Sequence, residues 1–113
     1  MKRIGLTVRA MSAVGLLAGV VFTVPAQAAE GDAKAALAKN SMCIGCHGIP
    51  GYKASFPEVY NVPYIAGQNA KYLEAALHAY KKGDRKHPTM RGIAETLTDQ
   101  DIADLAAYYS QAK

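Results

Sequence analysis

The stretch Cys43-Ile44-Gly45-Cys46-His47 contains the only two cysteines in this chain of 113 residues. Two thiols separated by two residues, with a histidine directly after the second, have the spacing at which a c-type haem is attached. Each thiol can form a thioether bond with one vinyl group of the porphyrin, and the histidine that follows can then bind the iron. The motif therefore predicts one haem c, attached covalently at Cys43 and Cys46, with His47 as the proximal iron ligand.

Three other roles for this motif agree less well with the rest of the chain. A thioredoxin-like redox pair belongs in a βαβ pattern, which the sequence does not show. A zinc site needs four ligands, and His47, His78 and His87 do not have the spacing of a zinc finger. A structural disulfide would leave the histidine of the motif without a role. Haem attachment is therefore the preferred interpretation.

The first 28 residues have the pattern of a secretory signal peptide. Lys2 and Arg3 precede an uncharged, mostly apolar stretch over residues 10–24, and Ala26-Gln27-Ala28 is a small-x-small cleavage signature. The uncharged run is close to the length of a membrane span, so an uncleaved membrane anchor is the alternative. We expect cleavage after Ala28 and export to the periplasm, where bacteria attach haem covalently.

The remaining residues, 29–113, have the length of one small domain. Three of the 13 basic residues (Lys2, Arg3 and Arg9) lie in the predicted signal peptide, so ten remain against nine acidic residues, a net charge of about +1. This balance gives no indication of nucleic-acid binding. A domain this short buries little apolar surface, and a covalently held haem would provide a large apolar body to pack around.

Three helices are predicted after the signal peptide. Residues 33–39 are rich in helix formers and predict a first helix that runs up to about the haem motif. A second helix follows Asn69 and ends at Gly83, because apolar residues recur between them at helical spacing. In the last helix, Thr98 and Asp101 have the spacing of a capping box.

Between the haem motif and the second helix, residues 52–67 contain Pro57 and Pro63 and predict an irregular loop. A loop of this length in a small domain is usually functional, and here we expect it to wrap the haem on the His47 side. No segment of the chain alternates regularly enough to predict a strand.

Met90 is the preferred second iron ligand. Of the two methionines outside the predicted signal peptide, Met42 adjoins the attachment motif and cannot easily reach the opposite face of the ring. Met90 lies between Pro88 and Gly92, which predict a loop between two helices from which a side chain can swing over the haem. An iron closed by methionine carries electrons, whereas an open iron binds small molecules. Ligation by His87, and core packing by Met90, are the alternatives.

Further segments match one family. They are Pro63–Gln68, Tyr72-Leu73, Leu77, Tyr80, Gly83-Asp84-Arg85, Met90, Ala94 and residues 97–109. Together with the attachment motif they resemble the class I c-type cytochromes, in particular the small monohaem group similar to cytochrome c553 and to one half of cytochrome c4. The segment 49–62 departs from this group, because it is not the glycine-rich loop that the resemblance leads us to expect.

The resemblance implies an all-α fold, the small cytochrome c fold, with three to four helices wrapped around one covalently bound haem. It implies that the backbone carbonyl of Pro63 accepts a hydrogen bond from His47, which would orient the imidazole and tune the iron. It also implies that the first and last helices cross beside the haem. The residues expected at this crossing are Ala33, Ala36 and Leu37 on one side and Leu105 with Tyr108 or Tyr109 on the other.

We therefore expect an electron carrier and not an enzyme. A haem ligated by His47 and Met90 has no room for a substrate on iron, so the protein would shuttle single electrons between redox proteins of a respiratory chain. The expected donor is a periplasmic dehydrogenase or a membrane cytochrome complex, and the expected acceptor is an oxidase or reductase. Contacts with these partners would be transient, and the carrier itself would be a monomer.

Two alternatives remain open at this point. The chain could be a haem subunit of a larger oxidoreductase complex, or a ligand-binding haem protein if Met90 does not hold the iron. The basic residues between positions 81 and 91 also have two interpretations, a docking rim for an acidic partner or a solvated helix end. These residues are Lys81, Lys82, Arg85, Lys86 and Arg91.

Overall fold

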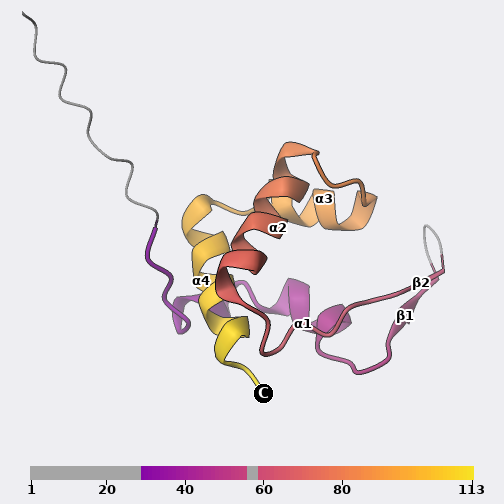
Figure 1. The fold of residues 1–113 in the computed structure, drawn as a ribbon, viewed down its shortest axis with the longest axis horizontal. Helices are drawn as coiled ribbons and strands as arrows, with labels where there is room; N and C mark the ends of the chain where they lie inside the picture. Colours follow the sequence, from indigo (N-terminus) through magenta and orange to yellow (C-terminus); the bar gives the residue numbers. More distant parts are fainter. Residues whose placement is uncertain (1–28, 56–58) are drawn as a thin grey trace, which may run out of the picture.

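The computed structural model describes residues 29–55 and 59–113 (Figure 1). The predicted signal peptide, residues 1–28, lies outside the described residues, as does Pro57. The described chain is mostly helical, as predicted, and none of its helices is both long and apolar enough to span a membrane. The elements are a 3-10 helix η1 (Ala35–Ala38), α1 (Ser41–His47), β1 (Lys53–Ala54), β2 (Tyr60–Asn61), α2 (Ala70–Lys82), α3 (Pro88–Glu95) and α4 (Asp99–Gln111).

Local sequence signals determine the ends of the two longest helices, α2 and α4, as predicted. The side chain of Asn69 accepts a hydrogen bond of 3.1 Å from the backbone N–H of Tyr72, and Gly83 ends α2 with a left-handed backbone (φ 86°). At the start of α4, Thr98 and Asp101 form the predicted capping box. These contacts satisfy backbone groups that the end of a helix leaves without a partner.

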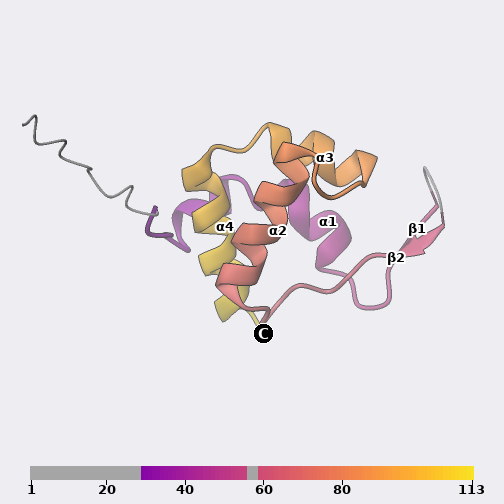
Figure 2. The same ribbon diagram turned by 45° about the horizontal axis from the view of Figure 1, so that its top comes forward.

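The core lies where α2, α4 and η1 meet. The helices α2 and α4 lie side by side, and α3 packs against α2 near its C-terminal end (Figure 2). Ile102 and Leu105 of α4 are the largest fully buried side chains. The core cluster consists of Ala36, Leu73, Leu97, Ile102, Leu105, Ala106 and Tyr109.

The start of the described chain packs closely on α4. A Cβ on Gly31 would collide with the carbonyl oxygen of Ala103, so the close approach requires a glycine. The buried carboxylate of Asp104 accepts hydrogen bonds from the backbone N–H of Asp32 (2.7 Å) and from the side-chain amide of Gln100 (2.8 Å). The N-terminal segment is thus held on α4 by both packing and hydrogen bonds.

The first helix differs from the prediction. A continuous helix over residues 33–39 is absent; η1 is only four residues long, and a separate helix, α1, carries the attachment motif. Between them Asn40 is buried and accepts a hydrogen bond from the hydroxyl of Tyr109, so a tertiary contact overrides local helix propensity. Ala36 is buried at the predicted crossing with α4, but Leu37 is 62% exposed and its predicted place there is wrong.

The expectation that the chain has no strand is also wrong. β1 and β2 pair antiparallel, with Lys53 opposite Asn61 and Ala54 opposite Tyr60, and this hairpin extends away from the helices (Figure 1). Strands of two residues are too short to produce a visible alternation of apolar and polar residues, so their pairing cannot be predicted from a pattern.

Met90 lies in a helix and not in the predicted loop. Pro88 occupies the first position of α3, where its fixed φ angle and missing N–H suit the start of a helix. Gly92, which was expected to mark the loop, is an interior residue of α3. A glycine costs a helix only about 1 kcal/mol relative to alanine, so it does not by itself end the helix. The second candidate ligand is therefore carried by a regular element.

Candidate functional site

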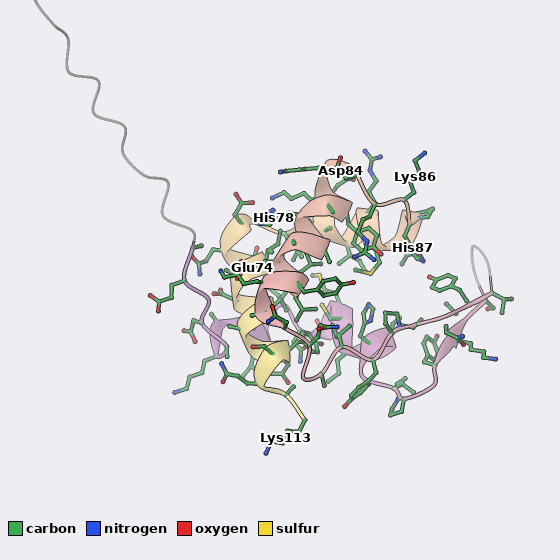
Figure 3. All side chains as sticks on the ribbon, viewed as in Figure 1. Glu74, His78, Asp84, Lys86, His87 and Lys113 are labelled. Carbon is green, nitrogen blue, oxygen red and sulfur yellow. The ribbon has the colours of Figure 1, made fainter. Side chains whose placement is uncertain are left out.

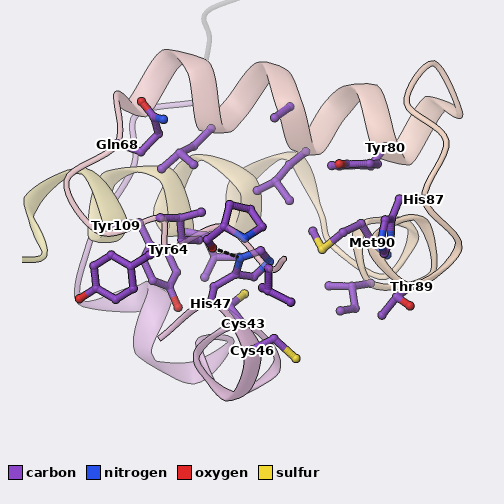
Figure 4. Close-up of a pocket in the computed structure, with 18 of the residues that line it drawn as sticks. Cys43, Cys46, His47, Tyr64, Gln68, Tyr80, His87, Thr89, Met90 and Tyr109 are labelled. Atoms are coloured by element: carbon purple, nitrogen blue, oxygen red, sulfur yellow. Dashed lines mark hydrogen bonds between the residues drawn. The ribbon is translucent and has the colours of Figure 1, made fainter. Parts of the chain in front are cut away.

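A cavity of about 620 Å³ is lined by residues of α1, α2, α3, α4 and the segment that includes the hairpin. Figure 4 shows part of this lining. Its size falls in the range of binding sites for small molecules and cofactors. The five predicted site residues all line it, although they come from three separate parts of the chain: Cys43, Cys46, His47, Pro63 and Met90. Most of the remaining wall is apolar or aromatic, and it includes Tyr52, Tyr60, Tyr64, Tyr72, Leu73, Leu77, Tyr80, Ile93, Leu105 and Tyr109.

Helix α1 presents both cysteines and His47 to this cavity. Both thiols are free, and they differ in environment: Cys43 packs partly against the core, whereas Cys46 is exposed. Burial raises the pKa of Cys43 to about 11, so this thiol is protonated at neutral pH. Because the two thiols and the imidazole lie within seven residues of one helix, all three reach the same side of the cavity.

His47 is oriented by a hydrogen bond to the segment that follows the hairpin. Its Nδ1 lies 2.7 Å from the carbonyl oxygen of Pro63, the contact implied by the resemblance (Figure 4). Since a carbonyl can only accept, Nδ1 carries the proton and donates it, which leaves the Nε2 lone pair free to bind a metal. A hydrogen bond of this kind orients an imidazole ligand and increases its basicity.

Met90 enters the cavity from α3, on the side away from α1. In Figure 4 its side chain extends from α3 into the cavity, with the sulfur atom directed toward the space beside His47. Met42 also lines the cavity, but it lies on α1 next to Cys43 and so belongs to the attachment side. Of the two methionines in the described residues, Met90 alone is placed across the cavity from His47.

The other two histidines have different surroundings. His78 does not line the cavity; it lies on α2 next to the start of α4, with its Nδ1 4.0 Å from the carboxylate of Asp99 (Figure 3). His87 does line the cavity, but its Nδ1 accepts a hydrogen bond of 3.3 Å from the backbone N–H of Met90. His87 thus acts as the N-cap of α3, a role that the sequence analysis missed because histidine is not a typical capping residue.

Arg85 is a charged residue that the sequence analysis did not assign to the site. It lines the cavity, and its guanidinium lies 4.7 Å from the centre of the Tyr80 ring. A hydrogen bond to the side chain of Tyr72 raises its pKa further, so Arg85 is a permanent positive charge in an otherwise mostly apolar wall. In the sequence, Arg85 stands out only as one of the basic residues between positions 81 and 91. Its place in the cavity wall depends on the turn at Gly83, which brings it back over α2.

The donor atoms fit a c-type haem better than the zinc site considered above. Within the described residues, no three His, Cys, Asp or Glu side chains are grouped closely enough to hold a metal ion. The cavity instead combines two thiols and an imidazole on one side, a thioether across from them, and a broad apolar wall between. Groups of these kinds could attach a haem c, ligate its iron and pack against its ring.

Comparisons with known proteins agree with this fit. Residues 32–113 match the family model of cytochrome c. Cytochrome c4 of Pseudomonas aeruginosa is 41% identical over 85 residues, which cover 75% of this chain and 40% of that protein. Cytochrome c-554(548) of Halomonas halodenitrificans is 43% identical over 83 residues, covering 71% of this chain and 95% of that protein. The thiosulfate dehydrogenase electron acceptor of Stutzerimonas stutzeri is 37% identical over 73 residues, covering 60% of this chain and 31% of that protein.

The match extends over the whole region that forms η1, the hairpin and the four helices. The chain spans less than half of the cytochrome c4 sequence and nearly all of the shorter cytochrome c-554(548). The predicted fold and cofactor are therefore confirmed, namely a small cytochrome c fold with covalently bound haem c. This chain belongs to the cytochrome c family, as a small class I c-type cytochrome domain similar to one half of cytochrome c4.

Proposed function

We propose that this protein is a periplasmic carrier of single electrons and not an enzyme. In this proposal Cys43 and Cys46 hold the haem through thioether bonds, and His47 and Met90 are its axial ligands. The observation that carries the proposal is that all four side chains line one cavity, with Met90 on the side away from the other three. When bound, the haem supplies a one-electron redox centre; the chain supplies its attachment, its ligands and its surroundings.

The residues of the cavity suit this task because they need not move when the charge on the iron changes. The Pro63 carbonyl keeps the His47 ring in one orientation, and Met90 is held in a helix. The wall of the cavity around them is mostly apolar or aromatic. Both oxidation states can then keep the same ligands, so electron transfer requires little rearrangement of the protein.

The basic cluster around Met90 divides into two parts. Lys81 donates hydrogen bonds to the carbonyl of Leu97 (2.7 Å) and to Asp99 (3.1 Å), and Arg91 pairs with Glu95 at 2.7 Å. Lys82, Arg85 and Lys86 are exposed and make no ion pair within the described residues. We propose these three as the docking rim for an acidic redox partner, since complementary charge mainly accelerates association.

The name of one relative supports a proposal for the partners. One relative is named as the electron acceptor of a thiosulfate dehydrogenase. We propose that this domain likewise receives electrons from a periplasmic dehydrogenase or a cytochrome complex and passes them to an oxidase or reductase. A place in the periplasm requires that residues 1–28 direct export, and mass spectrometry of the exported protein tests whether they are then cleaved.

An absorption spectrum of the purified holoprotein tests the ligand assignment. The oxidised form should show the weak far-red band of a sulfur–iron bond, and the reduced form should not change under carbon monoxide. Met90→Ala should remove the band and allow carbon monoxide to bind, whereas Met42→Leu should leave both properties unchanged. A wild-type spectrum that lacks the band and shifts under carbon monoxide would instead indicate a ligand-binding haem protein.

A further inference from the structure

His87 connects the helix of Met90 to two other elements. Its Nδ1 accepts the hydrogen bond from the Met90 backbone N–H that caps α3. Its ring also packs edge-on against Tyr60 of β2, with ring centres 4.6 Å apart at 81°, and more distantly against Tyr80 of α2, at 6.4 Å and 79°. The separations fall within the range of attractive edge-to-face contacts between aromatic rings. One half-buried side chain thus joins α3, α2 and the hairpin.

Tyr60 belongs to a segment that contacts both sides of the cavity. It pairs with Ala54 in the hairpin and lies three residues before Pro63, whose carbonyl accepts the hydrogen bond from His47. The same short segment therefore touches the proximal histidine at one end and, through Tyr60, the cap of the distal helix at the other. No other described segment makes aromatic contact with the ring of His87 except α2.

We propose that the Tyr60–His87 contact is a brace that positions Met90 against the iron. The cap fixes the first turn of α3, where Met90 lies, and the Tyr60 ring keeps His87 in the orientation that makes this cap. The inference rests on the proposed ligation by Met90 and goes beyond it, because it assigns positioning roles to two residues that do not themselves bind the iron.

The physical need for a brace comes from the shortness of α3. A helix of eight residues, with a glycine inside it, is not stable on its own and depends on its caps and its packing. The cap orders the backbone N–H of Met90 itself, so its loss acts directly on the candidate ligand. Without the Tyr60 ring, the His87 side chain is free to adopt other rotamers, and the cap is made for a smaller fraction of the time.

Binding of imidazole to the oxidised holoprotein measures the effect. Imidazole can occupy the iron only when Met90 leaves it, so the apparent affinity rises with the fraction of molecules in which Met90 is displaced. Tyr60→Leu removes the tyrosine ring. His87→Asn keeps a capping oxygen but loses the imidazole ring, and His87→Ala loses both. A fourth variant combines Tyr60→Leu with His87→Asn. Val59→Ala is the matched control, because Val59 neighbours Tyr60 but is 77% exposed and does not line the cavity.

The brace predicts an order of affinities. Tyr60→Leu should bind imidazole roughly threefold to tenfold more tightly than wild type, because the cap is made less often. His87→Asn keeps the cap without the ring and should stay close to wild type, and adding Tyr60→Leu to it should change the affinity little. His87→Ala should show the largest change, about tenfold to a hundredfold, with a weakened far-red band. Val59→Ala should behave as wild type.

Two results would overturn the brace. One is a wild-type affinity in Tyr60→Leu; the other is an effect of Tyr60→Leu that is as large in the His87→Asn background as in wild type. If wild type itself lacks the far-red band and binds imidazole as tightly as Met90→Ala does, the proposed ligation has failed instead. The spectrum of wild type therefore separates the two failures.

Discussion

His47 and Met90 approach the same cavity from opposite sides, and the two sides are built differently. On the proximal side, the two cysteines proposed to hold the haem and the proposed ligand His47 all lie on α1, and a hydrogen bond to the carbonyl of Pro63 orients the imidazole. On the distal side, the ligand stands in a short helix whose start depends on His87 and, through it, on Tyr60. We infer that the proximal ligand is secured by covalent chemistry, whereas the distal ligand is secured by packing. We therefore expect the proposed bond between Met90 and the iron to break more easily than the one between His47 and the iron.

The largest expected effect comes from removing each ligand in turn. His47→Ala should abolish accumulation of stable holoprotein, because the attached haem would lose the ligand that is built into its own motif. Met90→Ala should lose the sulfur–iron band but keep its haem, since the thioether bonds do not depend on α3. Haem content per protein, measured after export, tests the difference.

His78→Ala is the matched control for this experiment, because His78 lies outside the cavity. It should retain both haem and band. Equal loss of haem in His47→Ala and Met90→Ala would contradict the comparison between the two sides.

A smaller effect is expected at the hydrogen bond between Tyr109 of α4 and Asn40, the residue that precedes α1. Tyr109→Phe leaves the buried side-chain oxygen of Asn40 without its donor, which should lower the free energy of unfolding by about 1–3 kcal/mol. Thermal unfolding of the holoprotein measures this loss. Tyr108→Phe is the control, since no hydrogen bond of its hydroxyl occurs within the described residues.

The same pair gives a prediction for the dependence of stability on pH. Burial raises the pKa of Tyr109 above the ordinary tyrosine value of 10.0. A pKa that is higher in the folded state than in the unfolded state stabilises the fold below the unfolded value, and this contribution is lost as the pH rises above it. Stability should therefore decline above about pH 10 in wild type and decline less in Tyr109→Phe. An identical alkaline decline in both would show that another group is responsible.

The smallest expected effect concerns the intrinsic stability of α3. Nothing lies within 4 Å of an ideal Cβ on Gly92, so Gly92→Ala should strengthen this helix by about 0.5–1 kcal/mol. If the order of α3 limits how often Met90 leaves the iron, the variant should bind imidazole a few times more weakly than wild type. Ser110→Ala favours helix formation in α4 and should leave imidazole binding unchanged. A wild-type affinity in Gly92→Ala would mean that the order of α3 does not limit access to the iron.

The difference between the two sides also explains what could be predicted. The cofactor was recognisable because covalent haem chemistry demands fixed residues at fixed spacing. The caps of α2 and α4 were recognisable because Asn69, Gly83 and Thr98 act on neighbouring backbone. The hairpin could not be predicted, since two-residue strands leave no pattern. The break between η1 and α1 at Asn40 could not be predicted either, because it involves a contact with the distant Tyr109.

The sequence by itself determined the cofactor and the helical class of this protein, because these depend on short-range chemistry and on periodicity along the chain. The tertiary structure alone decided that Met90 stands in a helix, that His87 caps this helix against Tyr60, and that Arg85 returns to the wall of the cavity. Each of these depends on contacts between elements far apart in the chain or on the turns that bring them together. Such contacts are set by the packing of the whole domain, and no local pattern of residues records them.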